Sequence, residues 1–372
     1  MDDTSDLDNL LDIEYLLGLY NQSENTTDPA YVVEHSVKFC SKSDVNKFGA
    51  QFVPAFYFAT FVLGYLGNGL VLVILFKYEE LRNVTNIFLL NLVLSNLIFA
   101  SSLPFWGTYH LSEWIFGGFM CKVVSSAYLI GYNSSILFLT LMTLDRYLAV
   151  VHAIAAAKNR KKAYAVVASV VVWLVSVAAS MKEIVLRNVT ENKLHGILCE
   201  ETGYSQEVIE RGRLVSLYLQ FSVFFLIPLC LILFCYVSIT VRILATRMKE
   251  KCHTIKLIFV IIFTFFVFWT PYNIVCLLRA VRLSRADDGS CEDWVSLDYS
   301  LYVTRNVAYF YCGISPVFYT FVGKKFQSHF RRLVCRHVPC LKRRLSLSSQ
   351  SSRTTSQKYP ASTNQASVFS HV

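Results

Sequence analysis

Seven runs of apolar residues divide the chain, and polar or charged segments separate them. Each run is roughly 20 residues long or longer, which lets a helix cross the hydrocarbon core of a bilayer, about 30 Å thick. The pattern therefore predicts seven transmembrane helices. The predicted spans are residues 51–76, 86–108, 121–146, 163–181, 214–241, 255–279 and 297–322.

The charged residues outside the spans predict how the chain lies in the membrane. Residues 1–40 contain nine acidic residues and one lysine, whereas residues 324–372 contain ten basic residues and no acid. Because basic flanks stay in the cytoplasm, the carboxy terminus is predicted inside the cell and the amino terminus outside. The basic segments 152–163 and 242–256 agree with this topology. The acidic start does not resemble a secretory signal, so the first span is expected to act as the insertion signal.

Composition supports a membrane protein and disfavours other classes. The 372 residues are 54 % hydrophobic and only 16 % charged, which is too apolar for an ordinary soluble protein. The net charge of +9 does not indicate nucleic-acid binding, because the basic residues follow the cytoplasmic helix ends. The sequence offers no nucleophile–base pair, metal cluster or phosphate loop at a readable spacing, so no enzyme, metal or cofactor is expected. The seventh span contains no lysine for a retinal Schiff base, and the two halves show no transporter-like repeat.

The predicted topology places four of the eleven cysteines on the outer side. An even number in an oxidising compartment favours two disulfides. Three pairings are possible, and spacing alone does not choose among them. The four residues are Cys40, Cys121, Cys199 and Cys291.

Residues 1–50 are predicted to form an acidic extracellular tail. Such a segment attracts basic proteins from a distance, and the alternative is a tail that only aids solubility. Tyr15 follows Asp12 and Glu14, which makes it a candidate for sulfation and for ligand contact. Outer N-x-Ser/Thr sequons predict glycans at Asn21, Asn25 and Asn188.

The cytoplasmic end is predicted to hold a membrane-surface helix and a disordered tail. Residues 324–340 begin with apolar residues at helical spacing and basic residues between them, a pattern typical of an amphipathic helix in contact with membrane lipid. Cys335 and Cys340 follow as candidate palmitoylation sites, with ordinary cysteines as the equal alternative. Residues 341–372 are rich in Ser and Thr and would change charge strongly on phosphorylation.

Polar residues and prolines inside the spans are the most specific signals, since they are costly or disruptive in lipid. Asp145-Arg146-Tyr147 ends the third span, where the aspartate can neutralise the adjacent arginine. With matches in the first span and in the third to seventh spans, in order, the chain resembles the rhodopsin-like G protein-coupled receptors over roughly residues 50–335. The other matching residues are Asn68, Trp173, Pro228, Tyr236, Trp269, Pro271, Pro316 and Tyr319.

Within that class the chain resembles the chemokine receptors. The similarity rests on LPFW at 103–106, DRYLAVVHA at 145–153, FWTPYN at 268–273 and FVGKKF at 321–326, with the four outer cysteines. The stretches KYEELRNVTNIFLLNL, HTIKLIF and TRNVA are most similar to the XC-type receptor. The resemblance implies an all-α seven-transmembrane bundle over 51–323 with a short amphipathic eighth helix. It also implies disulfides joining Cys121 to Cys199 and Cys40 to Cys291.

The resemblance also implies where a ligand binds. Arg305 stands where many CC-type receptors have a glutamate that meets the ligand's amino terminus, and where the XC-type also has an arginine. Because a buried cation needs an anionic or carbonyl partner, Arg305 argues against a pocket for a positively charged ligand terminus. Aromatic residues line the rest of the implied cavity, although core packing explains any one of them equally well. They are Tyr57, Trp106, Tyr128, Trp269 and Tyr272.

The implied protein is a plasma-membrane receptor that binds a basic chemokine and activates a heterotrimeric G protein of the inhibitory class, which drives chemotaxis and calcium signalling. On activation, Arg146 would leave Asp145, and Tyr236 and Tyr319 would turn inward. Receptor kinases and arrestin are expected at the Ser/Thr-rich tail. The alternative is an atypical scavenger receptor that internalises chemokine without activating a G protein.

Two positions depart from the family pattern. Asn96 stands where the second span usually has an aspartate, and Ser315 where the seventh usually has an asparagine. In the family, the aspartate and the asparagine at these positions hold a sodium ion together with a serine that matches Ser135. A neutral amide attracts a cation far less than a carboxylate, so no sodium site is expected.

Overall fold

The structure of the protein is a computed structural model. The chain divides into two units, residues 1–41 and 42–372. The described residues are 43–81, 83–152, 162–192, 196–245, 251–285, 290–322, 328–330 and 332, and they belong to the second unit. For residues 43, 251–261, 285 and 312–322 the description covers the backbone only. Tyr15, Asn21, Asn25, Cys40, Cys335 and Cys340 lie outside the described residues, as do the side chains of Ser315, Pro316 and Tyr319.

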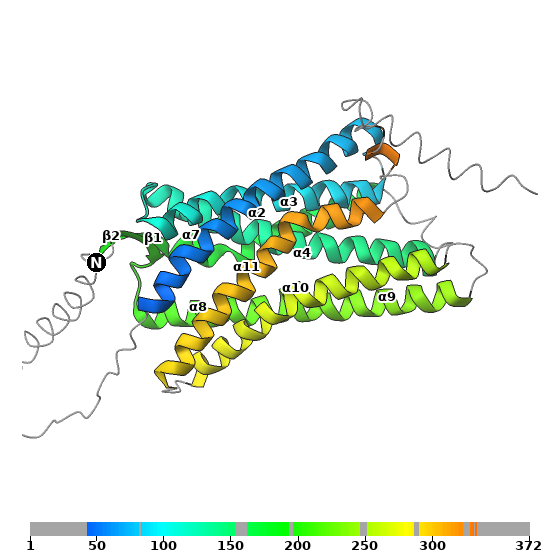
Figure 1. The fold of residues 1–372 in the computed structure, drawn as a ribbon. Coiled ribbons are helices and arrows are strands. Elements are labelled where there is room, and N and C mark those ends of the chain that lie inside the picture. Colours follow the sequence, from blue (N-terminus) through cyan, green and yellow to red (C-terminus); the bar gives the residue numbers. More distant parts are fainter. Residues whose placement is uncertain are drawn as a thin grey trace, which may run out of the picture. The chain divides into compact units, whose positions relative to one another are not determined.

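Long helices form at all seven predicted spans, which confirms the seven-helix bundle (Figure 1). Most run several residues past the apolar runs at one or both ends. The fifth span contains a π-helical turn, η1, between two α-helices. The bounds are α2 Ser43–Tyr78, α3 Val84–Leu111, α4 Gly117–Val151, α6 Lys162–Ala179, α8 Gln206–Phe221, η1 Ser222–Leu226, α9 Ile227–Ala245, α10 Lys251–Arg285 and α11 Cys291–Val322.

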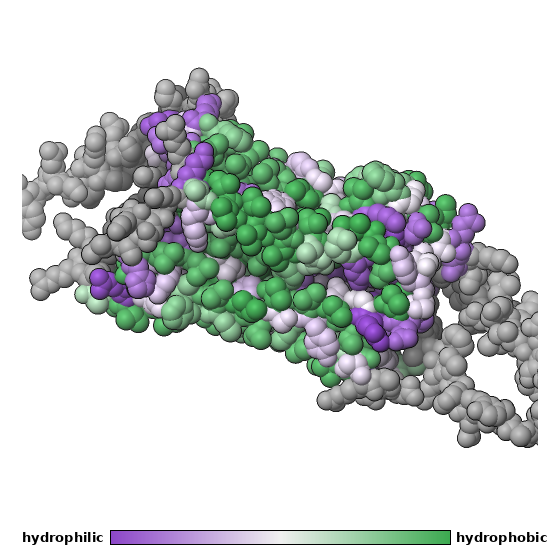
Figure 2. All heavy atoms as spheres, turned by 180° about the vertical axis from the view of Figure 1, so that it is seen from behind, coloured by the Kyte–Doolittle hydropathy of each residue, from purple (hydrophilic) through white to green (hydrophobic). Residues whose placement is uncertain are grey.

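The outer surface of the bundle suits a lipid environment. Within the described part of the chain, six helical stretches are long and apolar enough to cross a membrane, and α11 is the seventh long helix. Figure 2 shows a broad hydrophobic band over the middle of one face, with hydrophilic residues gathered toward its two ends. Exposed apolar side chains of α6 and α9 include Val167, Leu174 and Val241. Such exposure would be unfavourable in water, so the helices are expected to face lipid.

Helix α4 is the central helix of the bundle. It contacts α3, α6, α9 and the first strand. At Gly131 it approaches α3 so closely that an added Cβ would lie 2.5 Å from the backbone nitrogen of Phe99. Next to this point, Ser134 donates a 2.8 Å hydrogen bond to Ser95 of α3. Close backbone packing therefore fixes the position of the central helix against α3.

One element was not predicted: a β-hairpin follows the short helix α7, Met181–Leu186. Strands β1, Arg187–Asn192, and β2, Gly196–Glu201, pair antiparallel, with Val189 opposite Cys199. Gly196 opens β2 at φ +69°, a left-handed conformation that favours glycine. The end of the bundle that carries β1 and β2 is called the hairpin end below.

The predicted membrane-surface helix is described only in part. Residues 328–330 and 332 are helical, and the remainder of 324–340 lies outside the described residues. The His329 ring stacks on Tyr78 at 5.1 Å between centroids, and Phe330 packs against the core cluster formed by α2, α3, α4 and α6. These contacts join the segment to the end of α2.

Candidate ligand cavity and switch residues

A disulfide ties the hairpin to the bundle. Cys121 in the first turns of α4 and Cys199 in β2 are bonded, with their Cα atoms 5.7 Å apart, so the predicted Cys121–Cys199 pair is confirmed. Cys291 also forms a disulfide, and because Cys40 lies outside the described residues the second pairing stays a prediction. Asn188, in β1, is exposed, and its glycan also stays a prediction.

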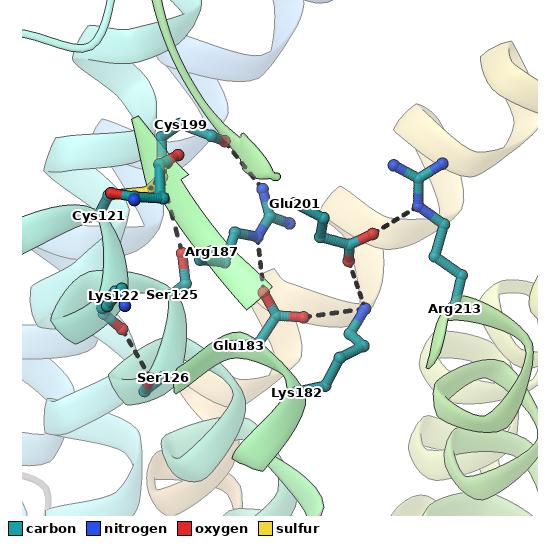
Figure 3. A network of polar contacts seen from close by, with 11 residues as sticks. Cys121, Lys122, Ser125, Ser126, Lys182, Glu183, Arg187, Cys199, Glu201 and Arg213 are labelled. Atoms are coloured by element: carbon teal, nitrogen blue, oxygen red, sulfur yellow. Dashed lines mark hydrogen bonds and ion pairs between the residues drawn. A yellow bond between two sulfur atoms is a disulfide. The ribbon is translucent and has the colours of Figure 1, made fainter. Parts of the chain in front are cut away.

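A network of ion pairs holds the same hairpin to two helices (Figure 3). Lys182 of α7 lies 2.6 Å from Glu201 of β2, and Glu201 also pairs with Arg213 of α8. Glu183 of α7 lies 2.6 Å from Nε of Arg187 in β1. Each of these charged side chains therefore pairs with an opposite charge on a different element.

Burial and charge act against each other within this network. Burial alone would raise the pKa of Glu201, but Lys182, Arg213 and Arg187 more than offset it and hold that pKa below its ordinary value. Burial alone would lower the pKa of Arg187, but Glu183 and Glu201 raise it above its ordinary value. Glu201 and Arg187 are therefore both charged at neutral pH.

A cavity of about 530 Å³ lies inside the hairpin end. Its walls come from α2, α3, α4, α7, both strands, α8, α10 and α11. Four of the residues predicted to line a ligand cavity are among its lining residues: Tyr57, Trp106, Tyr128 and Arg305. Its size is within the range of pockets that hold a small molecule or a few residues of a peptide.

Trp269 and Tyr272 are placed differently from the prediction, since they are not among the lining residues of this cavity. Both pack against Tyr132 of α4, with ring centroids 5.0 Å away for Trp269 and 6.2 Å away for Tyr272. Trp269 is 1 % exposed. The two residues form part of the aromatic core, together with Tyr309 of α11, which contacts the Tyr272 ring.

Besides the predicted Arg305, the cavity contains charged residues that the sequence analysis missed, among them Asp298. Asp298 and Arg305, with Tyr302 between them, line it from α11 at i, i+4 and i+7. This spacing places all three on one helix face and was the available signal. Glu183, Arg187 and Arg279 come from other elements, and no local pattern marks them.

The opposite end of the bundle holds the Asp145-Arg146-Tyr147 motif. Asp145 is 2 % exposed and accepts a 2.8 Å hydrogen bond from Oγ1 of Thr85 in α3. Arg146 is exposed, and the hydroxyl of Tyr147 lies 3.1 Å from Nε2 of His152. The contact with Thr85 was not predicted, and the expected pairing of Asp145 with Arg146 stays a prediction.

Three other predicted switch residues lie within α9, α10 and α11. Tyr236 of α9 is buried, and its hydroxyl interacts with the side chain of Thr143 in α4. Pro271 lies within α10, two residues after Trp269. Pro316 lies within the described backbone of α11.

A polar pair occupies the position of the family's sodium site. Nδ2 of Asn96 donates a 3.2 Å hydrogen bond to Oδ1 of Asn68, and Nδ2 of Asn68 donates to the carbonyl of Gly64 at 2.8 Å. Ser135 donates to the carbonyl of Tyr132. The residues described here are neutral amides and a hydroxyl, which do not fit a bare monovalent cation as well as a carboxylate would.

Comparison with known proteins identifies the class. The family model of the seven-transmembrane receptors of the rhodopsin family matches residues 67–319, so the chain belongs to that family. Within the family it belongs to the chemokine receptors. It is 40 % identical over 301 residues to C-C chemokine receptor type 3 of Cavia porcellus, a match that covers 80 % of this chain and 83 % of the relative.

Other relatives give the same result. C-C chemokine receptor type 4 of Homo sapiens is 38 % identical over 309 residues, covering 82 % of this chain and 84 % of the relative. C-C chemokine receptor type 1 of Homo sapiens is 37 % identical over 301 residues, covering 80 % and 84 %. The chain is therefore a multi-pass membrane receptor and not an enzyme, and the similarity to the XC-type stays a prediction.

Proposed function

We propose that this receptor binds a basic chemokine at its hairpin end and activates an inhibitory-class heterotrimeric G protein from the opposite end. The observation that carries the proposal is the cavity inside the hairpin end, in a chain about 40 % identical to a chemokine receptor over four fifths of its length. The Cys121–Cys199 disulfide supports an extracellular hairpin end, because such bonds persist in oxidising compartments. The carboxy terminus then lies in the cytoplasm.

The binding mode we propose has two contacts. The acidic tail attracts the chemokine body, and the amino-terminal segment of the chemokine enters the cavity beside Tyr57, Trp106 and Tyr128. Sulfation of Tyr15 would add negative charge to the first contact. Affinity should then fall as salt rises and fall again in Tyr15→Phe, whereas affinity unchanged by both would exclude docking on the tail.

Signalling would follow from a shift of population between two bundle conformations. A ligand favours the active one only if it binds that conformation more tightly. We propose that Trp269 and Pro271 bend the inner half of α10, and that Arg146, Tyr236 and Tyr319 then form the G protein site. Receptor kinases and arrestin would act on the Ser/Thr-rich tail, and Cys335 and Cys340 would carry palmitoyl chains in the plasma membrane.

Scavenging without signalling is the second candidate. The neutral contact between Asn96 and Asn68 favours it, because it replaces a charged position in the core that links the cavity to the switch in the family. The Asp145-Arg146-Tyr147 motif favours signalling.

One experiment separates the two functions. A chemokine panel is applied to cells that express the full-length receptor, and G protein activation and ligand uptake are measured in parallel. Uptake with G protein activation that pertussis toxin blocks supports the first proposal, and uptake alone supports scavenging. If no chemokine binds to a receptor detected at the cell surface, both proposals are wrong.

A further inference from the structure

The arginines that line the cavity differ in what neutralises them. Nη1 of Arg279 lies 2.8 Å from Oδ1 of Asp298, and Nε of Arg187 lies 2.6 Å from Oε2 of Glu183. Among the described residues, Arg305 has no carboxylate partner, and its buried Nε atom has no hydrogen-bond acceptor. Of the arginines that line the cavity, Arg305 is therefore the one with no carboxylate partner in the described part of the chain.

The groups around Arg305 do not replace that anion. The groups nearest to its charge are the phenols of Tyr57, Tyr272 and Tyr302 and the thiol of Cys276, and none of them is a carboxylate. The guanidinium lies 5.3 Å from the centroid of the Tyr302 ring. A cation–π contact offsets only part of the cost of burying an unpaired guanidinium. The cavity thus presents a donor that an anion would satisfy.

A second donor lies on the same cavity. The buried indole Nε1 of Trp106 has no hydrogen-bond acceptor among the described residues. Arg305 lies 14 residues after Cys291, the first residue of α11, which is about 21 Å along an α-helix. Glu200, in contrast, lies on the hairpin and is exposed. Among the lining residues, the exposed carboxylate of Glu200 thus lies at the hairpin, and the guanidinium of Arg305 lies deeper in the bundle.

We propose that Arg305 selects a ligand that brings a carboxylate deep into the cavity, so that an acidic side chain in the amino-terminal segment of the chemokine pairs with Arg305. Basic residues of the ligand then lie nearer Glu200. This inference rests on the proposed chemokine-binding function, and it adds the chemical class of the residue that reaches the base of the cavity.

A first test needs no ligand. Arg305→Met and Arg279→Met remove a guanidinium from the same cavity with a similar loss of volume, and purified full-length receptors are compared by thermal unfolding. Arg305→Met should raise the unfolding midpoint by roughly 2–4 °C, since it removes an uncompensated charge. Arg279→Met should lower it, because it leaves Asp298 without the ion pair. If Arg305→Met lowers the midpoint as much as Arg279→Met does, Arg305 is already neutralised and the proposal is wrong.

A second test uses the chemokines that bind in the panel. Each acidic residue in the amino-terminal segment of each chemokine is changed to the matching amide, and binding is measured to wild type and to Arg305→Met. One such change should weaken binding to wild type at least about tenfold and leave binding to Arg305→Met unaltered. A lysine at that position should in turn bind better to Arg305→Glu than to wild type.

The outcomes separate this inference from the proposed function. If panel chemokines bind wild type and no acidic residue of their amino-terminal segments matters, the role of Arg305 is wrong while chemokine binding stands. If no panel chemokine binds, the proposed function is wrong and this inference falls with it.

Discussion

The two ends of the bundle hold their charged residues in different ways. At the hairpin end, Lys182 of α7 and Arg213 of α8 both pair with Glu201 of β2. At the opposite end, the buried carboxylate of Asp145 is bonded to the neutral hydroxyl of Thr85, and Arg146 beside it is exposed. Ion pairs between elements hold the mouth of the cavity together at one end. At the other end, a buried hydrogen bond from Thr85 to Asp145 ties α3 to α4 beside an exposed arginine. The comparison shows that each end joins its elements through a carboxylate, but with a different kind of donor.

The largest expected effect comes from removing the covalent link at the hairpin end. Cys121→Ser breaks the bond to Cys199, and loss of a native disulfide typically costs about 2–5 kcal/mol. We expect surface expression and chemokine binding to be lost, as measured by flow cytometry on tagged receptor. Cys230→Ser, which changes an exposed cysteine of α9 outside any disulfide, is the control. Normal surface level and binding in Cys121→Ser would show that the ion pairs alone hold the hairpin.

A smaller effect is expected at the opposite end. Thr85→Val removes the hydroxyl that donates to Asp145, and a buried carboxylate that loses a donor costs about 1–3 kcal/mol. The unfolding midpoint should fall and basal G protein activity should change, while chemokine affinity stays within about twofold, because the ligand does not contact Thr85 and only a small shift of population reaches the cavity. Thr140→Val is the control, since Thr140 donates to the backbone of its own helix. A large loss of affinity in Thr85→Val would mean that the two ends are tightly coupled.

The hairpin end should also respond to acid. The pKa of Glu201 is held below its ordinary value of 4.5, so the stability that its ion pairs contribute is present in full above that value. It is lost as pH falls through the lower pKa of the folded state. Thermal unfolding of wild type and Glu201→Gln should therefore differ at pH 7 and converge as the pH drops below about 4.5. A difference that stays constant over this range would exclude the charged network as its cause.

The sequence alone was sufficient to predict the helices, but it did not predict most of the contacts between them. Apolar runs predicted all seven spans, because a bilayer sets the length of a helix. The hairpin was missed because apolar and polar residues do not alternate in RNVTEN and GILCEE as they do in a half-buried strand. Its position also depends on the disulfide and on ion pairs with α7 and α8, which a local pattern does not reveal. The hydrogen bond between Thr85 and Asp145 joins residues 60 positions apart, which no local pattern reveals.

The last prediction concerns the core between the two ends, where the smallest effect is expected. Asn96 is fully buried and donates to Asn68, so an amide pair occupies the place of a carboxylate. We expect that replacing choline with sodium at equal concentration leaves the affinity of a panel chemokine for wild type unchanged. The double mutant Asn96→Asp with Ser315→Asn restores the family residues, and sodium should then lower affinity by about fivefold or more, a usual size for coupling between sites.

Asn96→Asp alone separates charge from geometry. If the carboxylate suffices to attract the ion, the single mutant gains most of the sodium response, and if Ser315→Asn is also needed to complete the coordination, it gains little. A compensated pair of neutral residues predicts a wild type that signals without sodium sensitivity, because Asn96 and Asn68 keep the core hydrogen-bonded. If wild type itself loses affinity in sodium and the double mutant shows no larger response, the amide pair has not removed the cation site. The core would then couple the two ends in the same way as in relatives that have the aspartate.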